Sequence, residues 1–117
     1  MFILPFINVR ANVEIPQEKA EQIKSELGKA ISCIRGKSEA WLMVSIEDGC
    51  RLYFRGDGDT PAAFVEVKIY GSAGRAEYDA LTAQITAITS SSLSISPDRI
   101  YVKYEEVQNW GYNGHNF

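Results

Sequence analysis

Apolar and polar residues along this chain follow one plan, and the plan occurs twice. From residue 5 to residue 13 they alternate with a period of two, which predicts a strand with one buried face. Pro16 then opens a predicted helix that ends at Gly36. Its apolar face repeats at steps of three and four residues and consists of Ala20, Ile23, Leu27, Ala30, Ile31 and Ile34. A dense apolar run from Trp41 to Ile46 follows, as is typical of a central strand.

The second copy of the plan begins at residue 62. Residues 62–70 alternate as a strand, and Gly71 to Gly74 form a turn. A second helix follows, with an inner face of Tyr78, Leu81, Ile85 and Ile88. Ser96-Pro97-Asp98 breaks the chain before a strand from Ile100 to Glu106. We also expect a short strand at 52–54, and a hairpin or edge strand in the aromatic tail at 109–117 that docks elsewhere, for instance on a neighbouring subunit.

Two β-α-β units side by side predict an α/β (α+β) fold. Each unit is long enough for a right-handed crossover between parallel strands. The result is a four-stranded sheet with both helices on one face. Since no third helix is predicted to cover the other face, we expect the chain to associate through it.

Composition narrows the classes of function. The 117 residues fit a single domain over 1–117, and the net charge of −3 with scattered lysines and arginines argues against a nucleic-acid or membrane-surface role. No apolar stretch reaches the ~20 residues of a membrane span, and the start lacks the basic leader of a signal peptide. Cys33 and Cys50 sit in no metal or redox spacing. We therefore expect a cytoplasmic protein with reduced thiols, or one released without a signal peptide.

No metal or cofactor is expected. Gly56-Asp57-Gly58-Asp59 faintly resembles a calcium loop, but the remaining ligands and the closing Glu are missing, which favours a turn. His115 is the only histidine, in a tail rich in Gly and Asn, and we expect it at the surface. The sequence contains no Ser/His/Asp set and no phosphate loop.

Four short segments, in order along the repeat, resemble the macrophage migration inhibitory factor (MIF) family of the tautomerase superfamily. They are Pro5-Phe6-Ile7-Asn8, Gly36-Lys37, Ser96-Pro97-Asp98-Arg99-Ile100-Tyr101, and Trp110-Gly111-Tyr112-Asn113-Gly114 with Phe117 close behind. The resemblance implies a homotrimer whose sheets form a barrel, with active sites between subunits. It also implies keto–enol tautomerisation of aromatic α-keto acids such as phenylpyruvate, with an N-terminal proline as the base. Pro5 aligns with that proline.

Chemistry supports this role for a free Pro5. Removing a proton beside a carbonyl needs a base that is unprotonated near neutral pH. An α-amino group titrates at about 7.7–8.0. Burial among Phe6, Tyr101, Tyr112 and Phe117, together with a nearby ammonium, would lower the pKa of the Pro5 nitrogen.

The resemblance assigns further roles that the residues alone leave open. Lys37 matches the anchor for the substrate carboxylate, but it also suits a helix C-terminus, where a cation is favourable. Tyr101 matches a tyrosine contributed across the subunit interface, or it is an outward-facing strand residue. Tyr70 occupies a position that in the family usually holds a smaller residue, whose backbone N–H helps to bind the substrate. The larger tyrosine side chain would narrow the pocket. Lys103 replaces an asparagine, and it either favours a more anionic substrate or lies on a solvated strand face.

Residues 1–4 decide whether Pro5 can be a base. An internal proline nitrogen is an amide with no basicity, and methionine removal generally needs a small second residue, which Phe2 is not. Three hypotheses follow. In the first, Leu4 is the true start, since bacteria can also initiate at the codon UUG, which is otherwise read as leucine. In the second, a protease removes the leader. In the third, the leader stays, and the chain is a catalytically silent trimeric binding or cytokine-like signalling module.

Overall fold

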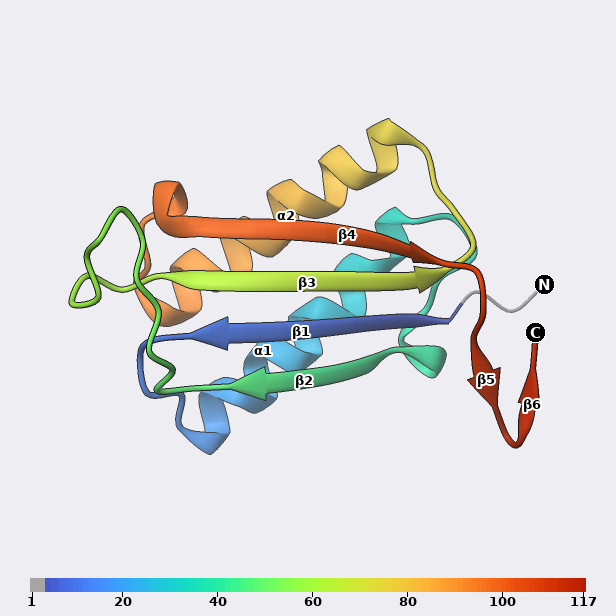
Figure 1. The fold of residues 1–117 in the computed structure, drawn as a ribbon, viewed down its shortest axis with the longest axis horizontal. Helices are drawn as coiled ribbons and strands as arrows, with labels where there is room; N and C mark the ends of the chain where they lie inside the picture. Colours follow the sequence, from blue (N-terminus) through green and yellow to red (C-terminus); the bar gives the residue numbers. More distant parts are fainter. Residues whose placement is uncertain (1–3) are drawn as a thin grey trace.

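A computed structural model describes residues 4–117, in which four strands form one mixed sheet with two helices on a single face (Figure 1). Strand β1 (Pro5–Ala11) leads to helix α1 (Gln17–Ala30) and strand β2 (Met43–Glu47). Strand β3 (Ala63–Tyr70), helix α2 (Arg75–Leu93) and strand β4 (Ile100–Val107) repeat the pattern. The short strands β5 (Gly111–Tyr112) and β6 (His115–Asn116) close the chain as a hairpin.

The order of strands across the sheet is β2-β1-β3-β4. Strands β1 and β2 are parallel, as are β3 and β4, while the central pair β1 and β3 is antiparallel. Each parallel pair thus belongs to one β-α-β unit, and the two units meet between β1 and β3. This arrangement confirms the predicted fold class.

The core lies between the sheet and the helices, and the period-two pattern positions it. Alternate residues of β1 and β3 are fully buried against the apolar faces of α1 and α2: Ile7, Val9, Val65, Val67, Ile23, Leu27, Leu81 and Ile85. Helix α2 begins where the Glu77 carboxylate accepts the Gly74 N–H at 2.9 Å. It ends where Ser94 takes a left-handed conformation with φ of 55°.

The helix-free face of the sheet carries charges that pair with one another. Glu47 accepts hydrogen bonds from Asn8 (3.0 Å) and Arg10 (3.2 Å). Lys103 lies 3.5 Å from both Glu66 and Glu105. Within residues 4–117, no helix is long and apolar enough to cross a bilayer.

One predicted strand and two predicted boundaries were wrong, and each has a local cause. The strand expected at 52–54 is a loop with one isolated bridge between Phe54 and Asp57, because the loop turns back on itself there. Trp41 belongs to a 3₁₀ turn, η2 (Glu39–Trp41), so that β2 begins only at Met43. The regular part of the first helix stops at Ala30 and continues as a 3₁₀ turn, η1 (Ile31–Cys33), before Gly36 reverses the chain at φ of 82°.

The predicted C-terminal hairpin is confirmed, and it packs on its own chain. The Phe117 N–H donates to the Trp110 carbonyl at 2.9 Å and closes the hairpin. The Tyr112 ring meets Trp41 edge-on at 5.4 Å, and Phe117 lies 5.7 Å from the Tyr70 ring. The hairpin therefore forms a wall at the end of the sheet where β1 begins (Figure 1).

Candidate active site at the head of strand β1

Pro5 is buried at the first position of β1, opposite Ile69 of β3. Its ring nitrogen is acylated by Leu4, whose side chain is also buried, with 4% of its surface exposed. The Leu4 carbonyl accepts a hydrogen bond from the Tyr70 backbone N–H at 3.0 Å. In this form the nitrogen is no base, and the neighbouring backbone donor is already occupied.

An open cleft of about 530 Å³ lies in front of Pro5. The turn η2 and the C-terminal hairpin supply its walls, together with the start of β1. It is lined by Leu4, Pro5, Phe6, Ala40, Trp41, Leu42, Met43, Trp110, Gly111 and Tyr112. Of the residues predicted for the site, Pro5, Phe6 and Tyr112 line this one cleft.

Aromatic rings continue from the cleft towards the end of β3. The Tyr112 and Phe117 rings are stacked, with centroids 6.3 Å apart and planes inclined by 11°. Phe117 in turn lies against Tyr70, which lines a second cavity of about 420 Å³. Trp41 contacts the other side of this series of rings through Tyr112, although sequence reasoning assigned it only to a strand. Its position after Gly36-Lys37 was the signal that could have placed it in the site.

Lys37 belongs to the segment between η1 and η2, and this segment lies at the end of the sheet where β1 begins (Figure 1). Only 4% of the residue is exposed, and among residues 4–117 its Nζ has no hydrogen-bond partner. Desolvation lowers the pKa of Lys37 to about 8, although the Glu77 carboxylate acts in the opposite direction. The Glu77 carboxylate is itself engaged by the backbone N–H groups of Arg35 (2.6 Å) and Gly74 (2.9 Å). Lys37 is thus an enclosed cation that feels the charge of Glu77 but, within residues 4–117, has no hydrogen-bond acceptor.

Tyr101 and Lys103 lie away from this cleft. Tyr101 pairs with Phe64, level with Arg10 of β1, so that it stands about 16 Å along the strands from Pro5. It lines a separate apolar cavity of about 220 Å³ with Phe54, Phe64 and Arg99 among others. Lys103 lies on the helix-free face of the edge strand β4, in its ion pairs with Glu66 and Glu105. Among residues 4–117, neither residue lines the cleft in front of Pro5.

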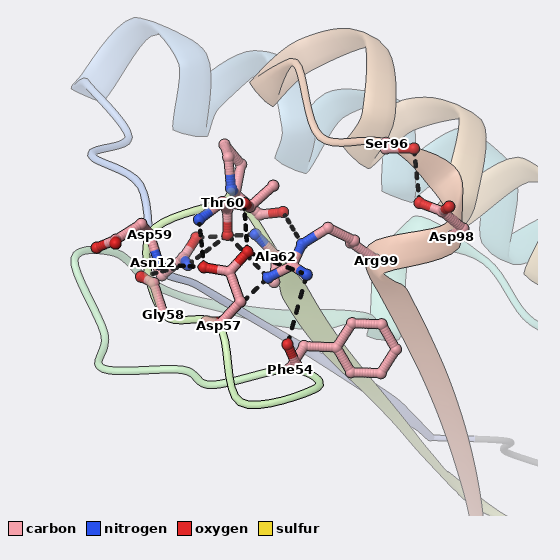
Figure 2. A network of polar contacts seen from close by, with 11 residues as sticks. Asn12, Phe54, Asp57, Gly58, Asp59, Thr60, Ala62, Ser96, Asp98 and Arg99 are labelled. Atoms are coloured by element: carbon pink, nitrogen blue, oxygen red, sulfur yellow. Dashed lines mark hydrogen bonds and ion pairs between the residues drawn. The ribbon is translucent and has the colours of Figure 1, made fainter.

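The loop at 54–61 closes around Arg99 (Figure 2). The guanidinium donates to the backbone carbonyls of Pro61 (2.9 Å), Thr60 (3.0 Å), Asp57 (3.2 Å) and Phe54 (3.5 Å). At the base of the loop, Asn12 donates to the Thr60 carbonyl at 3.0 Å and accepts from the Ala62 N–H at 2.8 Å.

The Asp57 carboxylate serves this loop as a turn residue, as predicted. It accepts the backbone N–H groups of Asp59 (2.8 Å) and Thr60 (3.1 Å), and the Thr60 hydroxyl. These hydrogen bonds, the Thr60 hydroxyl first, lower the pKa of Asp57 to about 2. Across residues 4–117 there is no cluster of three His, Cys, Asp or Glu side chains arranged to hold a metal ion.

Comparison with known proteins gives consistent matches. The sequence profile described as "Macrophage migration inhibitory factor (MIF)" matches residues 4–117. The macrophage migration inhibitory factors of Meriones unguiculatus and Rattus norvegicus are each 28% identical over 109 residues, covering 91% of this chain and 94% of theirs. Among solved structures, Leishmania major MIF2 superposes with a TM-score of 0.91 at 28% identity over 97% of both chains. The homologue from Prochlorococcus marinus superposes with a TM-score of 0.80 at 28% identity, over 96% of this chain and 98% of its own.

Proposed function

Since this chain belongs to the macrophage migration inhibitory factor family, and so has a tautomerase-like or MIF-like role, we propose that it is a phenylpyruvate-type keto–enol tautomerase. The base is the ring nitrogen of Pro5 after residues 1–4 have been lost. The substrate is a small aromatic α-keto acid, and the reaction needs no cofactor or metal. The working enzyme is a homotrimer in the cytoplasm, or one released without a signal peptide.

One observation carries this proposal: an enclosed cation without a partner stands at the same end of the sheet as Pro5. An unpaired buried ammonium is unfavourable, because it has lost its hydration and gained no anion in return. A substrate carboxylate would supply the missing charge at the Lys37 Nζ. Because that atom is enclosed in the present form, we expect carboxylate binding to open the turn at 36–41.

The proton transfer follows from a free Pro5. The secondary amine removes a proton from the carbon beside the substrate carbonyl, so that a C–H bond breaks and an N–H bond forms. The proton then passes to the carbonyl oxygen, which completes the enol. We expect the burial of Pro5, together with the charge of Lys37 at the same end of the sheet, to favour the unprotonated form of a free amine, whose ordinary pKa is about 7.7–8.0.

The segment before Pro5 blocks this chemistry in two ways. Residues 1–3 lie outside the described part of the chain, but Leu4 is described, and its bond to Pro5 removes the basicity of the nitrogen. Its carbonyl also occupies the Tyr70 N–H at 3.0 Å, the backbone donor that the family resemblance assigns to the substrate. Loss of residues 1–4 would free both groups at once.

Trimer formation is proposed because the site is incomplete in one chain. Pro5, Phe6, Tyr112 and Phe117 gather at one end of the sheet, whereas Tyr101 faces a cavity at the other end. In the proposed trimer Tyr101 of one chain, and Lys103 beside it, meet the Pro5 cleft of the next. Lys103 then adds a second positive charge, shared with Glu66 and Glu105.

A second function is a catalytically silent, MIF-like binding or signalling module. The observation that favours it is the acylated Pro5 with its occupied Tyr70 donor. In this case the cleft would bind ligands or partners without turning them over.

Two chains with different starts, and one substitution, separate the two functions. We expect the chain that begins at Pro5 to enolise phenylpyruvate. The ultraviolet absorbance of the enol measures the rate. The chain that begins at Leu4 is the matched control, since it differs by one residue and acylates the nitrogen. It should lose at least about 100-fold in kcat/KM, the usual minimum for a lost general base. Pro5→Gly, made in the chain that begins at residue 5, should fall similarly.

The contrary result is equally clear. If the chain beginning at Pro5 binds phenylpyruvate and yet enolises neither it nor other enolisable keto acids, the tautomerase proposal fails and the binding module stands. Intact-mass analysis of the protein from its native host then shows which start the cell uses.

A further inference from the structure

Arg99 is unusual among the cations of this chain because its hydrogen bonds are made to backbone, not to side chains. It donates to four carbonyls of the loop at 54–61, and its side chain is only 11% exposed. A planar guanidinium can serve several acceptors in fixed directions, which an ammonium cannot. The loop is therefore held to the 3₁₀ turn η3 (Pro97–Arg99), which directly precedes β4.

The same guanidinium lies over an aromatic ring. Its central carbon is 5.3 Å from the centroid of Phe54, which places a cation against a ring face. Phe54 in turn meets the Tyr101 ring edge-on, at 5.1 Å and 80°. Phe64 meets Tyr101 from the neighbouring strand at 6.3 Å and 90°. A continuous path of contacts thus leads from Arg99 through Phe54 to Tyr101.

Tyr101 needs such support because it stands on the helix-free face with 58% of its surface exposed. An exposed tyrosine changes rotamer freely unless neighbouring groups confine it. The two rings of Phe54 and Phe64 are those confining neighbours. Phe64 is fixed by the sheet, but Phe54 lies in a loop and keeps its place only if the loop does.

Two side chains anchor this loop, and each holds a different part of it. Asn12 binds its base, at Gly58, Thr60 and Ala62. Arg99 reaches the Phe54 carbonyl and the Phe54 ring. Loss of Arg99 is therefore expected to release Phe54 while Asn12 still holds the base of the loop.

We propose that Arg99 is a positioning residue which, through Phe54, holds the Tyr101 ring in the orientation in which it serves the Pro5 cleft of a neighbouring chain. The proposal rests on the function given above for Tyr101. It assigns to the loop at 54–61 the task of presenting a side chain to another subunit. The contact path itself lies within one chain and can be tested there.

The first test observes Tyr101 directly and does not depend on activity. The full chain is labelled with 3-fluorotyrosine at its six tyrosines, and Tyr101→Phe identifies the Tyr101 fluorine signal. We expect Arg99→Lys to shift or broaden that signal and to leave the Tyr112 signal, at the other end of the sheet, unchanged. Arg55→Lys is the matched control, because Arg55 also lies over Phe54, at 5.9 Å, but is exposed.

The second test asks whether the effect on turnover passes through Tyr101. In the chain that begins at Pro5, Arg99→Lys should lower kcat/KM for phenylpyruvate by up to about 100-fold, the loss that a misplacement of about 1 Å can cause. In a Tyr101→Phe background the same substitution should have little further effect, because coupled residues are not additive. If Arg99→Lys fails to fold, Phe54→Leu removes the ring alone and should reproduce both results.

An unchanged Tyr101 signal in both Arg99→Lys and Phe54→Leu would overturn the proposal. So would an equal loss of turnover with and without the Tyr101 hydroxyl. Should the chain beginning at Pro5 have no activity at all, the tautomerase proposal falls, while the fluorine signal still decides whether Arg99 positions Tyr101.

Discussion

Two enclosed cations stand at opposite ends of the same sheet, and their surroundings differ completely. Arg99 donates to four backbone carbonyls and lies 3.8 Å from the Asp57 carboxylate. Lys37 is 4% exposed, and nothing in the described part of the chain accepts a hydrogen bond from its Nζ. Within residues 4–117, the side-chain hydrogen bonds of Arg99 are all made to the loop, whereas the Lys37 Nζ makes none and is influenced only by the charge of Glu77.

This difference separates a scaffold from a site. Buried polar groups are nearly always paired, because an unpaired one costs free energy. A protein that keeps such a group sacrifices stability at that position, as many active sites do. The Arg99 end of the sheet is therefore expected to stabilise the fold, and the Lys37 end to be ready for an anion from outside.

The largest expected effect is a difference in sign between two matched substitutions. Arg99→Met leaves four carbonyls without their donor and should lower the free energy of unfolding by about 3 kcal/mol. Lys37→Met replaces an unpaired cation with an apolar side chain of similar length and should raise it by about 1 kcal/mol. Denaturant unfolding of both variants at one protein concentration measures this. Two losses of equal size would mean that Lys37 is structural.

A smaller effect should appear in the pH dependence of binding. Because the pKa of Lys37 is lowered to about 8, its charge is lost above that pH, well below the 10.5 of an ordinary lysine. The affinity of the chain beginning at Pro5 for benzoylformate, a non-enolisable α-keto acid, should fall about tenfold per pH unit above 8, since binding needs the charged form.

Two variants sharpen this prediction. Lys37→Arg keeps its charge and should bind with constant affinity through this range, while Lys37→Met should bind weakly at every pH. Calorimetric titration between pH 7.5 and 9.5 measures all three. An affinity that is independent of pH in the unsubstituted chain would exclude Lys37 as the carboxylate anchor.

The smallest effect concerns acid stability at the Arg99 end. The pKa of Asp57 is lowered from 3.8 to about 2, so its contribution to stability is complete above pH 3.8 and is lost as the pH falls towards 2. Asp57→Asn should therefore be less stable than the unsubstituted chain at pH 5, and the gap should close near pH 2. Because Asp57 is partly exposed, we expect a modest gap. A gap that stays constant from pH 5 to pH 2 would contradict this role for the carboxylate.

Much of the fold followed from short-range pattern. The period of two predicted β1 and β3 to within one or two residues, and steps of three and four predicted both helices. The pattern was less reliable at 41–42 and 52–54. At 41–42 the apolar run includes residues of a 3₁₀ turn and of the link to β2. At 52–54 it belongs to a loop that is closed by a single bridge. An apolar run records burial, and burial alone does not distinguish a strand from a packed loop.

The candidate site was predictable in parts. Pro5, Phe6 and Tyr112 do line one cleft, with Tyr70 and Phe117 beside it, although these residues are far apart in the sequence. Sequence reasoning missed the part that Trp41 plays in that wall and the hydrogen bond between Leu4 and Tyr70. No spacing rule predicts the second of these, because it arises only where β1 begins beside the end of β3.

The order of apolar residues alone determined which faces of the strands and helices are buried, since side-chain direction repeats with a fixed local period. Only the tertiary structure decided which cation is partnered. Arg99 finds its acceptors 38 to 45 residues earlier in the chain, where a folded loop brings its carbonyls together. Lys37 finds no acceptor within residues 4–117, and the Glu77 carboxylate that acts on its charge accepts the backbone N–H groups of Arg35 and Gly74 instead. The sequence alone does not distinguish these two cations, because the role of each depends on the groups that pack around it.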